Sequence, residues 1–233
     1  MSREPIAVLT GARRGIGRYL ATHFLERGWR VFGLSRNPSD LAHEAYVHVC
    51  GDVGNEADVR RLFDLARQSG GTLELLLNNA GIAAMNHALL TPATTIESLM
   101  RTNYVGTFLC SREAARLMQN NKFGRIVNFT TVAVPLSLAG EAAYAASKGA
   151  VETLTRILAR EFAPYGITVN AIGPTPIATD LIAGVPKEKI EQLIARQPIP
   201  RLGTLQDVAN VVDFFISPES SFITGQVLYL GGI

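Results

Sequence analysis

Tyr144 and Lys148 lie four residues apart, and on a helix this spacing places both side chains on one face. A tyrosine has an ordinary pKa of about 10, so proton exchange at neutral pH requires a lower pKa. A neighbouring ammonium lowers that pKa because it favours the phenolate. The pair could therefore act as an acid/base group, although the spacing by itself more often marks a packed tyrosine ring beside a lysine that reaches solvent.

A second candidate is the glycine-rich segment 10–17, which follows the apolar run 6–9 and precedes a helical pattern. Gly11 could make a tight turn, Gly15 could admit a pyrophosphate to the backbone, and Gly17 could let the helix pack closely on the strand. Exposed N–H groups and the helix dipole would favour the phosphates. The spacing Gly-x-x-x-Gly-x-Gly differs from the usual dinucleotide fingerprint, so an ordinary turn into a helix is the alternative.

The elements that must position these residues follow from the apolar pattern. Short runs rich in Val, Ile and Leu alternate with segments whose apolar residues recur every three or four positions. In most of these runs the residues that would point to either face of a strand are apolar, which is typical of strands covered on both faces. We predict an α/β fold, a Rossmann-type doubly wound sheet of about seven mostly parallel strands with helices on both faces. The predicted strands are 6–9, 31–34, 47–50, 73–77, 126–129, 167–172 and 227–230, and a long helix is predicted over 96–119.

The chain has 233 residues without a visible linker or repeat, so we expect one domain over 1–233. Apolar residues make up 47% and charged residues 18%, which excludes global disorder, and a net charge of +2 argues against a nucleic-acid binder. No apolar run approaches the roughly 18 residues needed to cross a membrane, and the polar start shows no signal peptide. The two cysteines are too few for a disulfide framework, and the four histidines show no metal-ligand spacing. We therefore expect a soluble, cytoplasmic protein with no metal site and no membrane or nucleic-acid partner.

Further motifs stand in order along the chain. Asn78-Asn-Ala-Gly81 closes the fourth predicted strand, Tyr144-Ala-Ala-Ser-Lys148 opens a helix, and Asn170-Ala-Ile-Gly-Pro174 ends the sixth predicted strand. Together with segment 10–17 and Asn103, these motifs resemble the short-chain dehydrogenase/reductases, and the resemblance covers essentially the whole chain. The general pattern is similar to the 3-oxoacyl-(acyl carrier protein) reductase-like branch of that family.

The resemblance implies roles for four residues. Tyr144 would be the acid/base on the carbinol oxygen, and Lys148 would lower the pKa of that tyrosine and hold the nicotinamide ribose. Asn103 would help hold a water linked to Lys148, unless it only bonds a neighbouring backbone carbonyl. The family's serine thirteen residues before the tyrosine is Thr131 here, which keeps the hydroxyl and adds a methyl. Thr131 is expected to do the serine's work, with a backbone cap or a weakened activity as the alternatives.

A dinucleotide cofactor is also implied by the resemblance. The second predicted strand ends at Ser35 and Arg36, without the acid that usually holds a ribose 2′-hydroxyl. Arg36 and Arg14 match positions that carry basic residues in NADP-preferring members, so NADP(H) is expected to be preferred over NAD(H). The implied cofactor-binding residues are Gly11, Arg13, Arg14, Gly15, Ile16, Gly17, Ser35, Arg36, Asp52, Val53, Asn79, Ala80, Gly81, Tyr144, Lys148, Pro174, Ile177 and Thr179.

The activity implied by the resemblance is interconversion of a carbonyl and a secondary alcohol by hydride transfer. The substrate would be a small-molecule or acyl-thioester carbonyl, with a 3-oxoacyl thioester, a small ketone and a sugar all open. The helix-like segment 178–197 would be an inserted substrate lid, and a homotetramer or homodimer is expected. The alternatives are an NAD-dependent alcohol dehydrogenase and a non-catalytic dinucleotide-binding regulator.

Overall fold

The computed structural model describes residues 4–179 and 187–232. A seven-stranded sheet runs through it in the order β3-β2-β1-β4-β5-β6-β7, and every neighbouring pair of strands is parallel. Each predicted strand coincides with one of these, the last being one residue too long, and the predicted fold class is confirmed. The strands are β1 (Pro5–Thr10), β2 (Arg30–Ser35), β3 (Tyr46–Cys50), β4 (Thr72–Asn78), β5 (Gly124–Phe129), β6 (Ile167–Gly173) and β7 (Val227–Tyr229).

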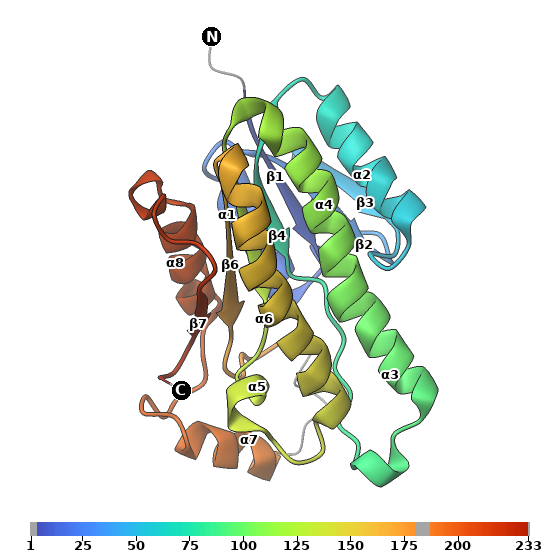
Figure 1. The fold of residues 1–233 in the computed structure, drawn as a ribbon, viewed down its shortest axis with the longest axis vertical. Helices are drawn as coiled ribbons and strands as arrows, with labels where there is room; N and C mark the ends of the chain where they lie inside the picture. Colours follow the sequence, from blue (N-terminus) through green and yellow to red (C-terminus); the bar gives the residue numbers. More distant parts are fainter. Residues whose placement is uncertain (1–3, 180–186, 233) are drawn as a thin grey trace.

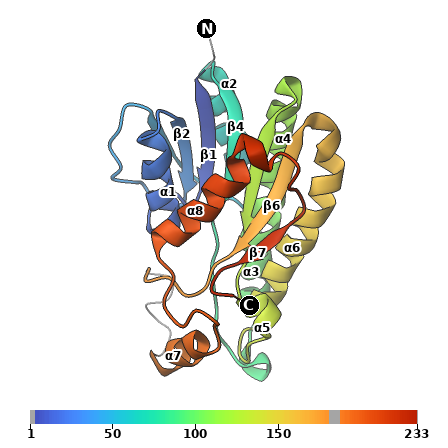
Figure 2. The same ribbon diagram turned by 90° about the vertical axis from the view of Figure 1, so that its left-hand side faces the viewer.

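Helices cover both faces of the sheet (Figures 1 and 2). On one face lie α2 (Glu56–Gln68), α4 (Gly106–Met118) and α6 (Ala142–Phe162), and on the other lie α1 (Gly15–Leu25) and α8 (Leu205–Ile216). The alternating side chains of β1 divide between two cores accordingly, because Ile6 and Val8 pack with α2 and α4 whereas Ala7 and Leu9 pack with α1 and α8. The remaining helices are α3 (Ala93–Leu99), α5 (Ala133–Leu136) and α7 (Lys187–Ala195), with short turns η1 (Ala88–Leu90), η3 (Gln119–Asn121), η4 (Ala163–Tyr165) and η5 (Pro218–Ser220). Among the helices described, none is both long and apolar enough to cross a membrane.

The carboxyl ends of the parallel strands meet at one end of the molecule, where α5 and α7 also lie (Figure 1). Strand order reverses between β1 and β4, and open α/β sheets bind ligands outside the strand ends at such a switch point. The described part of the predicted lid 178–197 lies at this end. Within it the structure shows α7, whereas 180–186 lie outside the described residues.

The long helix predicted over 96–119 is not regular. α3 continues directly into η2 (Met100–Val105), a π-helical segment, and then into α4. The amide of Gly106 donates to the carbonyl of Arg101, five residues earlier, which is the π-helical pattern. The prediction is therefore corrected over 100–105, because an apolar period does not reveal one widened turn. Asn103 lies in this segment, and π-helical segments are frequent at functional sites.

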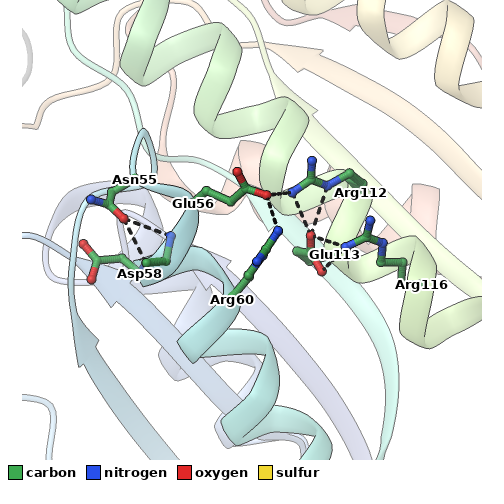
Figure 3. Close-up of polar contacts among 8 residues, drawn as sticks. Asn55, Glu56, Asp58, Arg60, Arg112, Glu113 and Arg116 are labelled. Carbon is green, nitrogen blue, oxygen red and sulfur yellow. Dashed lines mark hydrogen bonds and ion pairs between the residues drawn. The ribbon is translucent and has the colours of Figure 1, made fainter.

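An ion-pair network joins α2 to α4 (Figure 3). Glu56 Oε1 lies 2.6 Å from guanidinium nitrogens of both Arg60 and Arg112. Glu113 lies 2.9 Å from Arg112 and 2.8 Å from Arg116. The Glu56–Arg112 pair links the two helices, and the nearly buried Glu113 holds the Arg112 guanidinium from within α4.

Candidate active site

Two joined cavities open at the carboxyl ends of the strands, with volumes of about 420 and about 200 Å³. Residues shared by both walls show that the cavities meet beside the glycine-rich turn: Ile16, Asn79, Gly81, Ile82 and Thr179. The larger cavity also brings together the predicted residues Thr131, Tyr144, Lys148, Pro174 and Ile177. The smaller one brings together Gly11, Arg13, Arg14, Gly15, Ser35, Arg36, Asp52, Val53 and Ala80. Two predicted site residues, Gly17 and Asn103, are absent from the described walls.

Tyr144 and Lys148 line the larger cavity from the start of α6. The Lys148 side chain is buried, and its Nζ donates to the carbonyl oxygen of Phe129 at 2.8 Å, where β5 ends. Burial lowers the pKa of Lys148 to about 8. Burial raises the pKa of Tyr144 to about 12. The negative charge of Glu141 adds to this rise, and the Thr131 hydroxyl opposes it. Burial therefore keeps Tyr144 protonated at neutral pH, and the expected lowering of the tyrosine pKa by Lys148 stays a prediction.

Thr131 follows β5 directly and stands beside Tyr144 in the cavity wall. Its hydroxyl makes a side-chain hydrogen bond with Tyr144, which lowers the pKa of the tyrosine. The same Oγ1 accepts from the amide of Ala133 at 3.3 Å. The backbone bond named as an alternative for Thr131 therefore occurs, and its expected part in the serine's work stays a prediction. Two neighbouring hydroxyls can hold one carbonyl oxygen between them.

Asn103 is completely buried behind this wall. Its Oδ1 accepts from the amide of Ile82 at 2.9 Å, and its Nδ2 donates to the Ile82 carbonyl at 3.0 Å and to Ser147 Oγ at 2.9 Å. A Cβ added at Gly81 would stand 3.2 Å from Lys148 Nζ and 3.3 Å from Asn103 Oδ1, so both groups pack against this glycine. Asn103 thus fixes the chain that leaves β4 through the backbone of Ile82, which is distant in sequence, rather than bonding a neighbouring carbonyl of its own helix. Its part in a proton relay stays a prediction.

The glycine-rich turn forms the floor between the two cavities. Gly11 and Gly15 have φ of +69° and +55°, a left-handed backbone conformation that glycine adopts without strain. A Cβ added at Gly17 would collide with the carbonyl oxygen of Gly11, so Gly17 brings α1 against β1, as its spacing predicts. Gly15 and Ile16 begin α1 and line the smaller cavity, which places the positive end of the helix dipole at its wall. Such a cradle fits a diphosphate.

Charge in the smaller cavity is predominantly positive. The described residues of its wall include three arginines and one aspartate: Arg13, Arg14, Arg36 and Asp52. The Asp52 carboxylate accepts from the amide of Gly54 at 2.8 Å and so shapes the turn after β3. The cavity therefore suits an anion with more than one phosphate group.

Sequence reasoning did not select eight polar residues of the described cavity walls, namely Thr130, Glu141, Thr175, Lys189, Gln192 and Arg196 in the larger cavity and Asn37 and Thr102 in the smaller one. Burial raises the pKa of Glu141, and the charge of Lys189 opposes that rise. The available signal for Glu141 was its position three residues before Tyr144, whereas Lys189 reaches the cavity through tertiary structure.

The fold and these joined cavities define a Rossmann-type α/β protein with its site at the switch point of the sheet. Residues 11–232 match the family model described as enoyl-(acyl carrier protein) reductase. A short-chain type dehydrogenase/reductase of Picea abies is 35% identical, with 97% of this chain and 91% of the relative covered. The 3-oxoacyl-[acyl-carrier-protein] reductase of Vibrio cholerae is 33% identical, with 97% and 96% covered. The chain belongs to the short-chain dehydrogenase/reductase family of oxidoreductases.

Solved structures agree with this placement. The 3-ketoacyl-(acyl-carrier-protein) reductase of Brucella melitensis, complexed with NADH, superposes with a TM-score of 0.89 at 28% identity, covering 99% of this chain and 98% of that one. A structure of ElxO with NADP bound superposes with a TM-score of 0.88 at 29% identity, covering 98% and 97%. The resemblance to the 3-oxoacyl-(acyl carrier protein) reductase-like branch therefore holds over nearly the full chain.

Proposed function

We propose that this protein is an NADP(H)-dependent oxidoreductase that interconverts a carbonyl and a secondary alcohol. One observation carries the proposal. Tyr144 lines the larger cavity beside Thr131 and the buried Lys148, and this cavity meets the arginine-lined cavity at the glycine-rich turn. The first cavity would hold the carbonyl substrate, and the second the adenosine half of the dinucleotide. Gly11, Gly15 and Gly81 would hold the diphosphate and the nicotinamide side between them.

The proposed chemistry assigns the proton to Tyr144. When bound, NADP(H) would supply hydride-transfer chemistry at the carbonyl carbon. Because the pKa of Tyr144 is about 12, its hydroxyl is protonated at neutral pH and is ready to donate to the carbonyl oxygen during reduction. Thr131 would turn its one O–H from Tyr144 to the carbonyl oxygen when substrate binds, and so donate a second hydrogen bond there. In the oxidative direction Tyr144 must first lose its proton, so oxidation should accelerate as the pH rises.

The cofactor preference rests on charge at the end of β2. Arg36 follows β2 directly, and Arg14 precedes the first residue of α1. Both line the smaller cavity, where two guanidinium groups match a 2′-phosphate. The solved relatives include one with NADH and one with NADP bound, so the preference of this chain is argued from its own arginines.

The substrate class rests on the wall of the larger cavity. Apolar side chains form most of the wall around Tyr144: Ile82, Ala83, Met85, Val132, Leu138, Ile190 and Leu193. This surface suits an uncharged carbonyl compound or one carried on an acyl thioester. Relatives named as 3-oxoacyl-(acyl carrier protein) reductases support the second form.

We also propose that residues 1–233 act as one domain that assembles through α4 and α6. Val105, Phe108 and Ile157 are large apolar residues with exposed fractions of 38%, 38% and 48% on the helices of one sheet face. Burying such residues against a second copy would be favourable, which supports the expected homodimer or homotetramer.

The function is tested by following NADPH absorbance with small ketones and acetoacetyl-coenzyme A as probes. We expect NADPH oxidation with at least one probe, and the Tyr144→Phe variant provides the control for chemistry at this site. Tight binding of NADPH without turnover of any probe would argue for a dinucleotide-binding regulator instead.

Arg36→Asp is expected to weaken use of NADPH by roughly 10- to 100-fold in kcat/KM, because a charged contact with the 2′-phosphate is replaced by repulsion. Use of NADH should change little, since NADH lacks that phosphate. Steady-state kinetics with both cofactors measure the effect, and Arg160→Asp, an exposed arginine of α6, serves as the matched control. Equal losses with NADPH and NADH would contradict the proposed preference.

Thr131→Val keeps the shape of the side chain and removes its hydroxyl. We expect kcat to fall roughly 10- to 100-fold, because one donor to the carbonyl oxygen is lost and Tyr144 loses its partner. Thr131→Ser should retain most of the activity. If the valine variant turns over as fast as the wild type, the threonine serves as a backbone cap alone.

A further inference from the structure

Residues 36–45 connect β2 to β3 without a helix or strand of their own. The first part of this connection matters for the smaller cavity, because Ser35, Arg36 and Asn37 all line it. His48 of β3 contacts both neighbours of Arg36: its Nε2 lies 3.0 Å from the carbonyl oxygen of Asn37 and 3.0 Å from Ser35 Oγ. Ser35 Oγ also donates to the Asn37 carbonyl at 3.1 Å. One imidazole thus bonds the side chain of Ser35 and the backbone of Asn37, the two neighbours of Arg36.

The hydrogen bonds of His48 have a defined direction. A carbonyl oxygen can only accept, so Nε2 carries the proton that is donated to Asn37. In the neutral ring Nδ1 is then an acceptor, and the Tyr46 hydroxyl lies 2.8 Å from it. Burial raises the pKa of Tyr46, so its hydroxyl keeps the proton that it donates to His48.

Ser39, in the loop after β2, lies beside Tyr46 and lowers the pKa of its hydroxyl. Ser39 Oγ in turn accepts from the amide of Leu41 at 3.2 Å. The hydrogen bonds therefore run in one direction from Tyr46 through His48 to Asn37.

Packing places the two side chains over β2. Tyr46 and His48 are two residues apart on an edge strand, so they point to the same face of the sheet. His48 pairs with Gly33 of β2, and a Cβ added at Gly33 would collide with the Tyr46 hydroxyl. The missing side chain of Gly33 makes room for Tyr46, which lets the pair reach the loop that follows β2.

We infer that Tyr46 and His48 are positioning residues that hold Ser35–Asn37 so that Arg36 meets the 2′-phosphate of the cofactor. The inference rests on the proposed preference for NADP(H). A braced backbone lowers the conformational cost of ordering the long arginine side chain when the phosphate binds. The two residues thereby set the ratio of affinities for NADPH and NADH, whereas they leave the nicotinamide side of the site unchanged.

The test is direct binding, measured with purified full-length protein by nicotinamide fluorescence for NADPH and NADH and by calorimetry for 2′,5′-ADP and 5′-AMP. In His48→Leu we expect the Kd of NADPH and 2′,5′-ADP to rise roughly three- to tenfold, with NADH and 5′-AMP unchanged. His48→Gln places an amide N–H near the position of Nε2 and should restore most of the affinity, whereas His48→Asn should not. Tyr46→Phe should weaken NADPH in the same direction. His43→Asn is the matched control, since His43 lies in the same connection and bonds Ala45 rather than residues 35–37.

The possible results distinguish a wrong role for Tyr46 and His48 from a wrong cofactor preference. A wild-type protein that binds NADPH and NADH equally overturns the proposed cofactor preference, and the role of His48 with it. A wild-type protein that prefers NADPH, with an unchanged ratio in His48→Leu and Tyr46→Phe, overturns the inference alone. Equal weakening of both cofactors together with a lower Tm also overturns it, because it shows a merely structural role.

Discussion

Replacing Tyr144 with phenylalanine is expected to reduce kcat by about 10²- to 10⁴-fold in carbonyl reduction, the range that general acid catalysis supplies. The substitution removes one hydroxyl from the wall of the larger cavity and keeps the ring, so the packing of the start of α6 is preserved. The lost hydroxyl is protonated at neutral pH, because burial raises the pKa of Tyr144 to about 12. Steady-state kinetics with NADPH and a responsive ketone measure the loss.

Controls for this experiment follow from the geometry. The Kd of NADPH and the Tm of Tyr144→Phe should stay close to those of the wild type, since the hydroxyl lies on the substrate side of the joined cavities. Tyr165→Phe removes a hydroxyl from an exposed tyrosine outside both described walls and should change nothing. A Tyr144→Phe enzyme that keeps a tenth or more of the wild-type kcat would rule out Tyr144 as the proton donor.

Lys148→Met is expected to lower kcat by roughly 10²-fold or more and to change the dependence of stability on pH. The activity should fall because the buried ammonium at the end of β5 is lost from the cavity that contains Tyr144. The stability effect arises because burial lowers the pKa of Lys148 from its ordinary value of 10.5 to about 8. Between these two values the unfolded chain binds more protons at this site than the folded one.

The sign of the stability effect is therefore fixed. Below about pH 8 Lys148 is charged in both states and its burial opposes folding in full, and this penalty disappears as the pH rises toward 10.5. The free energy of unfolding of the wild type should rise over this interval relative to that of Lys148→Met, as measured by urea unfolding. Lys187→Met, at a highly exposed lysine of α7, is the control and should follow the wild type. Parallel curves for the wild type and Lys148→Met would show that Lys148 is not buried in solution.

Much of the fold could be predicted from sequence because its determinants are local. The buried strands are short apolar runs, and the parallel arrangement follows from their alternation with helical patterns. The turn at Gly11 and Gly15 depends on backbone angles that glycine adopts easily, so it was recognisable from residue type and position. The π-helical segment η2 was not predictable in this way, because its widened turn depends on bonds and packing beyond the apolar period.

The sequence by itself determined which groups could do chemistry here, namely the tyrosine–lysine pair, the glycine-rich turn and the arginines after β2. Only the tertiary structure decided how those groups behave. Asn103 bonds Ile82, which lies 21 positions earlier, Lys148 bonds the carbonyl of Phe129, and His48 bonds residues on both sides of Arg36. The physical reason is that a pKa and a hydrogen-bond partner depend on burial and on neighbours brought together by the fold. Residue spacing alone suggested a tyrosine made more acidic by its lysine, whereas burial in the folded protein makes it less acidic.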